Sequence, residues 1–214
     1  MRELKRRGAP LSDMNALEMF GGDGSRHTLD YCRLVKSLDI WEVNQLMEPA
    51  LCRNFPTASI TIGNSFEQIL LTKKTYDLLV IDNSAGLFGL HKEYCEHFEA
   101  FAPSLFRILR PSAVVILNVV PDLEKTTHAS DSTVSTTQLA RRAAFYQTEH
   151  PAQIAIDQMV PIYAGIARRA GFEMVWHFTL CRTVRTQVHY LVMKLSRLTV
   201  PAHANGCLAS FTAK

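Results

Sequence analysis

Short apolar runs alternate along this chain with longer segments in which apolar residues recur at helical spacing. From Ala16 onward, a β-branched or leucine-rich run is followed by a polar turn and a helical stretch, and this order repeats to about Lys194. Such alternation is typical of βαβ units, in which parallel strands form a sheet that helices cover on both faces. The pattern therefore predicts an α/β fold built on one sheet.

The predicted strands differ in how clearly they stand out. Tyr76–Asp82 is the clearest, because it is apolar on both faces as a central parallel strand is. The other runs that we expect to be strands are Ala16–Phe20, Ile40–Val43, Ser59–Ile62, Ala113–Val120, Phe172–Leu180 and Val188–Lys194.

Helices are predicted between these strands. Pro56 and Pro111 each follow a helical segment and prevent it from continuing. Pro161 lies inside the last segment and predicts a break or kink there, and Gly171 is a suitable residue just past its end. The expected helices are Thr28–Ser37, Leu46–Asn54, Glu93–Leu109, Gln138–Gln147 and Ala152–Ala170.

The remaining segments define the domain organisation. The chain has 214 residues, of which 47% are hydrophobic and 20% charged, so we expect one domain over residues 1–197. Met1–Asp13 is basic and polar and is either a frayed helix or a tail. Pro121–Pro151 interrupts the alternation and is expected to be a lid insertion, because long loops in compact domains usually bind ligands. Residues 198–214 are expected to be a flexible tail.

Charge and cysteine content narrow the class of protein. The net charge of +3 comes from scattered pairs such as Arg168 and Arg169, so we expect no nucleic-acid partner. The five cysteines form no C-x-x-C pair, which predicts reduced core thiols. No apolar run is long enough for a membrane span. We therefore expect a cytoplasmic protein.

A glycine-rich loop follows the first predicted strand. Gly21, Gly22 and Gly24 separate this strand from a helix that Ser25 is expected to open, so backbone N–H groups would face a ligand there. Glu42 lies in the second predicted strand about 20 residues later, where nucleotide-binding βαβ units carry the carboxylate that binds ribose hydroxyls. The loop and the acid together predict a nucleotide-like ligand.

The stretch from Glu18, read as E-x-F-G-G-x-G, resembles the first motif of class I S-adenosylmethionine-dependent methyltransferases. Phe20 matches the variant in which an aromatic residue replaces the first glycine. Gly63–Ile69 is similar to the family's adenine turn, and the last helix and two strands match its C-terminal order. The resemblance covers about Ala16 to Lys194. It implies a Rossmann-like three-layer sandwich with a seven-stranded, mostly parallel sheet and an antiparallel last strand.

The resemblance also implies S-adenosyl-L-methionine as cofactor, with Glu18 ordering the glycine loop that lines its methionine part. Glu42 would hold the ribose hydroxyls. Asn64, where the family usually has Asp, would contact the adenine. The implied cofactor-binding residues are Glu18, Phe20, Gly21, Gly22, Asp23, Gly24, Glu42, Val43, Asn64, Ser65, Phe66, Asp82 and Asn83.

Asp82 and His91 are the candidate catalytic residues. Asp82 would orient the cofactor amine, act as a base or cap a helix, and His91 is either a base or an exposed loop residue. His27 is expected to pack on the glycine loop. Asn118 and Asp122 give a poor metal pattern, so no metal is expected.

The expected activity is methyl transfer to an oxygen or nitrogen of a small molecule. The alternatives are an RNA methyltransferase, an enzyme similar to aminopropyltransferases such as spermidine synthase, and a non-catalytic methyltransferase-like subunit. Ala85 stands where the aminopropyltransferases carry a second acid. Little of the chain precedes the first strand, so the lid is expected elsewhere or from a partner. A homo-oligomer is left open.

Overall fold

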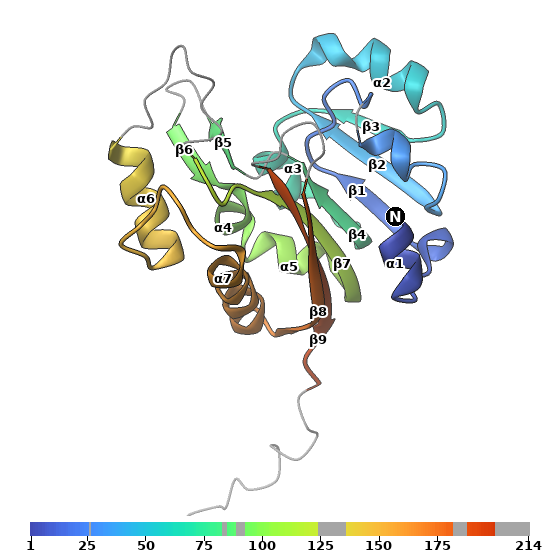
Figure 1. Ribbon diagram of the computed structural model, residues 1–214. Helices are drawn as coiled ribbons and strands as arrows, with labels where there is room; N and C mark the ends of the chain where they lie inside the picture. Colours follow the sequence, from blue (N-terminus) through green and yellow to red (C-terminus); the bar gives the residue numbers. More distant parts are fainter. Residues whose placement is uncertain (26, 83–84, 89–92, 124–135, 182–187, 200–214) are drawn as a thin grey trace, which may run out of the picture.

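A seven-stranded sheet forms the middle layer of the molecule (Figure 1). The computed structural model describes residues 1–25, 27–82, 85–88, 93–123, 136–181 and 188–199. In spatial order the strands are β3 (Ser59–Ile62), β2 (Ser37–Glu42), β1 (Asn15–Glu18), β4 (Tyr76–Ile81), β7 (Leu109–Val119), β9 (His189–Arg197) and β8 (Phe172–Cys181). Only β9 runs antiparallel to its neighbours. The predicted Rossmann-like sheet with an antiparallel last strand is confirmed.

Helical segments cover both faces of this sheet (Figure 1). One face packs against α3 (Ser65–Leu71), α4 (His97–Phe101), α5 (Ser104–Ile108), α6 (Thr136–Tyr146) and α7 (Ile156–Arg169). The other face packs against α1 (Arg2–Arg6), η1 (Leu11–Asp13), η2 (Thr28–Asp30), η3 (Gln45–Met47) and α2 (Glu48–Asn54).

Strand β4 lies at the centre and shows why the sequence is apolar there. Leu79 and Ile81 enter the core on the α7 face, whereas Leu78 and Val80 enter the core on the α1 face. Because side chains alternate along a strand, a strand buried on both faces needs apolar residues at every position. The prediction of Tyr76–Asp82 as the central strand is confirmed.

The predicted helix Thr28–Ser37 is wrong. Only the short 3₁₀ turn η2 forms, and the Lys36 N–H already donates to the Met14 carbonyl (2.9 Å) beside β1. The Tyr31 side chain is buried and reaches back to Glu18, which draws this segment against the sheet. With β2 beginning at Ser37, too few residues remain for a full helix.

The predicted helix Glu93–Leu109 is also wrong as one element. Its first part is strand β6 (Glu93–Glu96), which pairs antiparallel with β5 (Ala85–Phe88) in a separate two-stranded sheet. The rest divides into α4 and α5 at Pro103, which has no backbone N–H to continue a helix. Pro111 lies inside β7, at the point where the pairing of β7 with β4 shifts register. At such an irregularity the strand does not need a backbone N–H to pair with its neighbour, so proline is tolerated.

The amino-terminal segment is not a frayed tail. Leu4 and Leu11 are buried in the core of the α1 face. The Arg7 guanidinium lies 5.2 Å from the Trp176 ring centroid and 5.0 Å from that of Phe178, both on β8. Cation–π attraction and burial together hold the segment on the sheet.

Two further predictions need correction. Helix α7 is not broken at Pro161, because only one backbone bond near its first turns is lost. The thiols of Cys52 and Cys181 are exposed and that of Cys32 is half-buried, so the prediction of core thiols is wrong for these three. No helix in the described ranges is long and apolar enough to cross a membrane.

Helix α6 confirms a helix within the predicted lid region, close to the expected Gln138–Gln147. Arg142 anchors it, because this fully buried side chain donates from Nε to the Pro151 carbonyl (2.9 Å) and from a terminal nitrogen to the Val120 carbonyl (2.8 Å). Its guanidinium also lies over the Tyr146 ring. Residues 124–135 lie outside the described residues, so the lid itself stays a prediction.

Replacing Arg142 with Met should lower the free energy of unfolding by about 2–4 kcal/mol, because two buried carbonyls lose charged donors. Urea denaturation measures the change. The matched control is Arg141→Met on the exposed side of the same helix, which should change stability by less than about 1 kcal/mol. Equal losses in both variants would contradict the anchoring role of Arg142.

Candidate functional site

The glycine loop packs tightly at two positions and is open at a third. A Cβ added to Gly21 would collide with Ile40, and one added to Gly24 would collide with the Phe55 ring. Gly24 also has φ +70°, a conformation that side chains disfavour. A Cβ at Gly22 would meet nothing within 4 Å, so this residue borders open space. The loop is therefore open on its Gly22 side and closed at Gly21 and Gly24.

Glu42, at the end of β2, fixes this loop. Its Oε2 accepts a hydrogen bond from the Gly22 N–H (2.6 Å), and its Oε1 accepts one from the Asn44 N–H (2.8 Å). The residue is 8% exposed. Each carboxylate oxygen accepts about two hydrogen bonds, so both oxygens keep one acceptor position.

The loop continues without opening a helix at Ser25, so that prediction is wrong. Asp23 Oδ1 accepts hydrogen bonds from the Ser25 N–H (2.9 Å) and hydroxyl (2.7 Å), which closes a local turn. Asn54 Nδ2 donates to the Asp23 carbonyl (2.9 Å) and ties the turn to α2. Asp23 shapes the loop from its exposed side.

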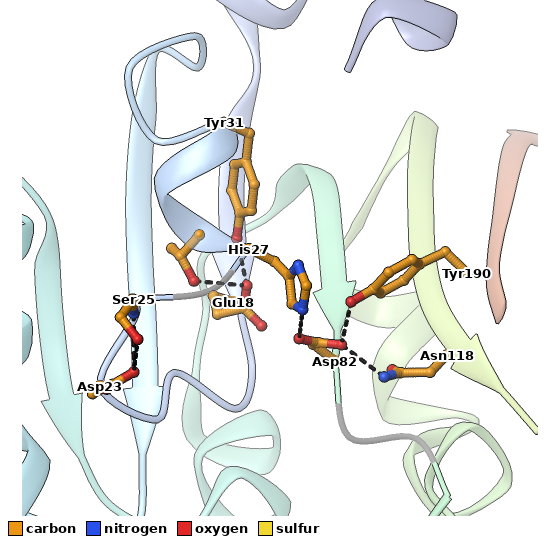
Figure 2. Close-up of polar contacts among 9 residues, drawn as sticks. Glu18, Asp23, Ser25, His27, Tyr31, Asp82, Asn118 and Tyr190 are labelled. Atoms are coloured by element: carbon orange, nitrogen blue, oxygen red, sulfur yellow. Dashed lines mark hydrogen bonds and ion pairs between the residues drawn. The ribbon is translucent and has the colours of Figure 1, made fainter. Parts of the chain in front are cut away.

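Glu18 ends β1 as a buried acid that is 1% exposed. Its Oε2 accepts hydrogen bonds from the Tyr31 hydroxyl (2.6 Å) and the Thr28 hydroxyl (3.4 Å), as Figure 2 shows. Burial raises the pKa of Glu18 to about 8 despite the Tyr31 hydrogen bond, and the negative charge of Asp82 adds to the rise. Oε1 has no hydrogen-bond partner among the described residues. Glu18 is therefore mostly protonated at neutral pH.

Asp82 follows β4 and gathers side chains from other elements (Figure 2). Its Oδ1 accepts hydrogen bonds from Asn118 Nδ2 (2.7 Å) and the Tyr190 hydroxyl (3.0 Å), and its Oδ2 lies 3.4 Å from His27 Nε2. The His27 and Tyr190 rings meet edge to face, with centroids 5.3 Å apart. His27 thus faces Asp82, and the expectation that it packs on the glycine loop is wrong.

The sequence alone did not assign roles to Asn118, Tyr190, Tyr31 or Thr28. Asn118 and Tyr190 are register partners on β7 and β9. Because β9 runs antiparallel, its first residues lie at the edge where the parallel strands end. The prediction of an antiparallel last strand therefore already implied that residues near its start, such as Tyr190, would lie at the same edge of the sheet as Asp82.

The predicted adenine turn caps α3. Asn64 Oδ1 accepts a hydrogen bond from the Phe66 N–H (3.0 Å), and the buried Ser65 hydroxyl donates to the Met19 carbonyl. The Phe66 ring stacks on Phe101 with centroids 4.3 Å apart, and Phe20 packs beside both rings.

Other predicted site residues are placed differently or are not described. Val43 follows β2 and is 68% exposed. Asn83 and His91 lie outside the described residues. Within the described ranges, no three His, Cys, Asp or Glu side chains gather in a way that could hold a metal ion.

Glu18 should make stability depend on pH. Its pKa is about 8 when folded and near its ordinary 4.5 when unfolded, so between these values the folded state holds a proton that the unfolded state has lost. The contribution of Glu18 to the free energy of unfolding should be complete below about pH 4.5. As the pH rises to about 8, this contribution should fall by at most ~1.4 kcal/mol per pH unit. Glu18→Gln should lack this slope in urea denaturation.

The control for this measurement is Glu67→Gln, which changes an exposed acid on α3 and should keep the wild-type slope. The same slope in Glu18→Gln and wild type would show that Glu18 ionises normally.

Comparison with known proteins gives matches in structure but not in sequence. No protein-family model matches the chain, and no curated protein sequence matches it. In contrast, 672 solved chains match its structure. Three of these chains overlap with nearly the whole sequence.

A candidate RNA methyltransferase from Pyrococcus horikoshii matches with 12% identity and a TM-score of 0.54, over 92% of this chain and 81% of that one. The N-methyltransferase NodS from Bradyrhizobium japonicum matches with 14% identity and a TM-score of 0.53, over 92% and 94%. The 1,6-didemethyltoxoflavin-N1-methyltransferase from Burkholderia thailandensis, solved with S-adenosylhomocysteine, matches with 15% identity and a TM-score of 0.53, over 92% and 75%. The chain has the fold of the class I S-adenosylmethionine-dependent methyltransferases.

Proposed function

We propose that this protein transfers a methyl group from S-adenosyl-L-methionine to an oxygen or nitrogen of a small molecule. The observation that carries the proposal is the bond from the Gly22 N–H to Glu42, at the carboxyl ends of β1 and β2. Open α/β sheets bind ligands at this edge. Here the loop is held in place while Gly22 borders open space.

The residues at this edge fit the chemical groups of S-adenosyl-L-methionine. Glu42 keeps two acceptor positions, enough for two ribose hydroxyls. The Glu18 Oε1 atom is buried without a partner in the described structure, and a donor or a cation from a ligand would satisfy it. Val43 and Phe66 offer apolar surface beside Asn64, whose amide nitrogen is a donor for an adenine edge.

The roles assigned to individual residues follow from this fit. Glu42 would bind the ribose hydroxyls, the loop from Gly21 to Gly24 would line the methionine part, and Asn64 and Phe66 would contact the adenine. When bound, the cofactor supplies a methyl group that its sulfonium has already activated. The protein then has to orient an acceptor, exclude water and take up a proton. Asp82 and its neighbours are the groups proposed for the last task.

A small-molecule acceptor is favoured over RNA. The structural matches include proteins named for both kinds of acceptor. The net charge of +3 is small, and the basic residues are scattered, whereas nucleic-acid sites concentrate positive charge. The free thiols of Cys32 and Cys52 support the proposed cytoplasmic location.

Calorimetric titration of S-adenosyl-L-methionine and S-adenosylhomocysteine tests the cofactor site. The wild type should bind both in the micromolar range, and Glu42→Ala should weaken binding about 30-fold or more, because a charged partner is worth about 2 kcal/mol. Fluorescence of the buried Trp41, next to Glu42, provides a second readout.

The matched control is Glu48→Ala, which removes an exposed carboxylate at the start of α2 and should leave the affinity unchanged. Absence of binding by the wild type would refute the proposed function. Equal losses in the two variants would refute the role of Glu42.

A further inference from the structure

A cavity of about 260 Å³ lies on the α1 face of the sheet, beside the Asp82 cluster. Apolar side chains form most of its wall, and a few polar side chains lie on one side. The apolar ones include Leu4 of α1, Val80, Ile116 and Val192 of the central strands, and Phe178 and Leu180 of β8.

The polar side of this cavity is also a wall of the candidate cofactor site. His27 and Tyr190 line the cavity, and both contact Asp82. Tyr31 lines it as well and donates its hydroxyl hydrogen bond to Glu18. In Figure 2, His27 and Tyr190 both point toward Asp82, and Tyr31 points toward Glu18. A molecule in the cavity would therefore touch the groups that surround Asp82 and Glu18.

We propose that this cavity holds the methyl acceptor and that His27, oriented by Asp82 and Tyr190, takes the proton that the acceptor loses. The inference rests on the proposed methyl transfer. Its acceptor is a mostly apolar molecule of one or two rings that carries a hydroxyl or N–H group. A cavity of about 150 Å³ already binds benzene, so the volume suits such a molecule.

The contact of His27 with Asp82 suits the imidazole to take up a proton. Nε2 lies 3.4 Å from Oδ2 of Asp82, so a positive charge on the imidazole would be stabilised by the carboxylate. In Figure 2 the second ring nitrogen points away from Asp82. Asp82 then stabilises the imidazolium, and the Tyr190 hydroxyl and ring edge fix both partners.

The proton step balances as follows in atoms and charge. The acceptor's O–H or N–H bond breaks, and its electron pair stays on the acceptor atom as the nucleophile for the methyl group. The proton goes to the imidazole of His27, beside Asp82, and later to water. The positive charge that accompanies the transferred methyl group therefore leaves as this proton.

A second cavity, on the opposite face of the sheet, is less suited to hold the acceptor. Its volume is about 610 Å³, and it lies between α5, α6 and α7 on the opposite face, lined by residues such as Phe106, Phe145 and Gly165. None of its lining residues contacts Asp82 or Glu18 through a bond described above. It is therefore separated from the carboxylates by the sheet and its core.

The test uses 2-naphthol as the probe and 2-methoxynaphthalene, which lacks the proton, as its control. In NMR titration of the free protein, 2-naphthol should bind with a Kd below about 1 mM and shift the His27 ring resonances, and the control should shift them several-fold less. Leu180→Trp at the cavity wall should weaken binding at least tenfold. Val175→Trp, equally exposed on β8 but outside the cavity, should not.

The second measurement follows methylation of 2-naphthol. His27→Gln should lower kcat about 100-fold or more, as expected for a lost general base, while the Kd for S-adenosyl-L-methionine stays within about twofold. Besides His27, the described titratable groups that line the cavity or lie next to His27 and Asp82 are Asp82 itself, Tyr190, Tyr31, Asp30, Glu18 and Cys181. Asp82→Asn should therefore be measured beside His27→Gln and should lower the rate in the same direction.

The outcomes separate this inference from the proposed function. Cofactor binding without any naphthol-induced shift of His27, or equal effects of the two tryptophan variants, would overturn the acceptor cavity. An unchanged kcat in His27→Gln would overturn the proton acceptor. Failure of the wild type to bind the cofactor would instead refute the proposed function.

Discussion

Three acids stand at the ends of three neighbouring strands, at one edge of a sheet that is buried on both faces. Glu18 and Glu42 are the last residues of β1 and β2, and Asp82 follows β4, which pairs in parallel with β1. Asp39 and Asp77 lie near the other ends of β2 and β4, where polar neighbours donate hydrogen bonds to both. In the middle of these strands an unpaired charge would lie in the core, which is very unfavourable. The glycine loop, Asn118 and Tyr190 are arranged around the three acids at the first edge.

The surroundings give these acids different chemistry. Glu42 accepts two backbone N–H groups and holds the glycine loop, and Asp82 accepts bonds from two side chains and faces His27. Glu18 accepts hydrogen bonds from two hydroxyl groups, but burial raises its pKa to about 8, so it keeps a proton at neutral pH. A neutral acid beside an ionised one is a common way for enzymes to divide acid and base roles.

Local sequence patterns predicted the strands, because burial on both faces leaves a continuous apolar run that ends at a polar residue. The antiparallel last strand and the roles of the acids were implied by the family resemblance. The local patterns did not predict that Tyr31 would bind Glu18 in place of a helix, or that β6 would pair with β5. They also missed Tyr190 beside Asp82. Glu18 and Tyr31 are 13 residues apart, β5 and β6 are neighbours in the chain, and Tyr190 is 108 residues from Asp82. All three features depend on specific contacts between side chains or strands, about which local periodicity carries no information.

The way α1 is attached has a consequence for ligand entry. Within the described residues, its hydrogen bonds and ion pairs are all local, and burial of Leu4 and the stacking of Arg7 on β8 attach it to the sheet. Leu4 and Phe178, one of the rings under Arg7, also line the cavity. Outward displacement of α1 would open this wall without breaking any hydrogen bond of the sheet. The rate at which a molecule enters would then depend on one short helix, independently of the stability of the whole fold.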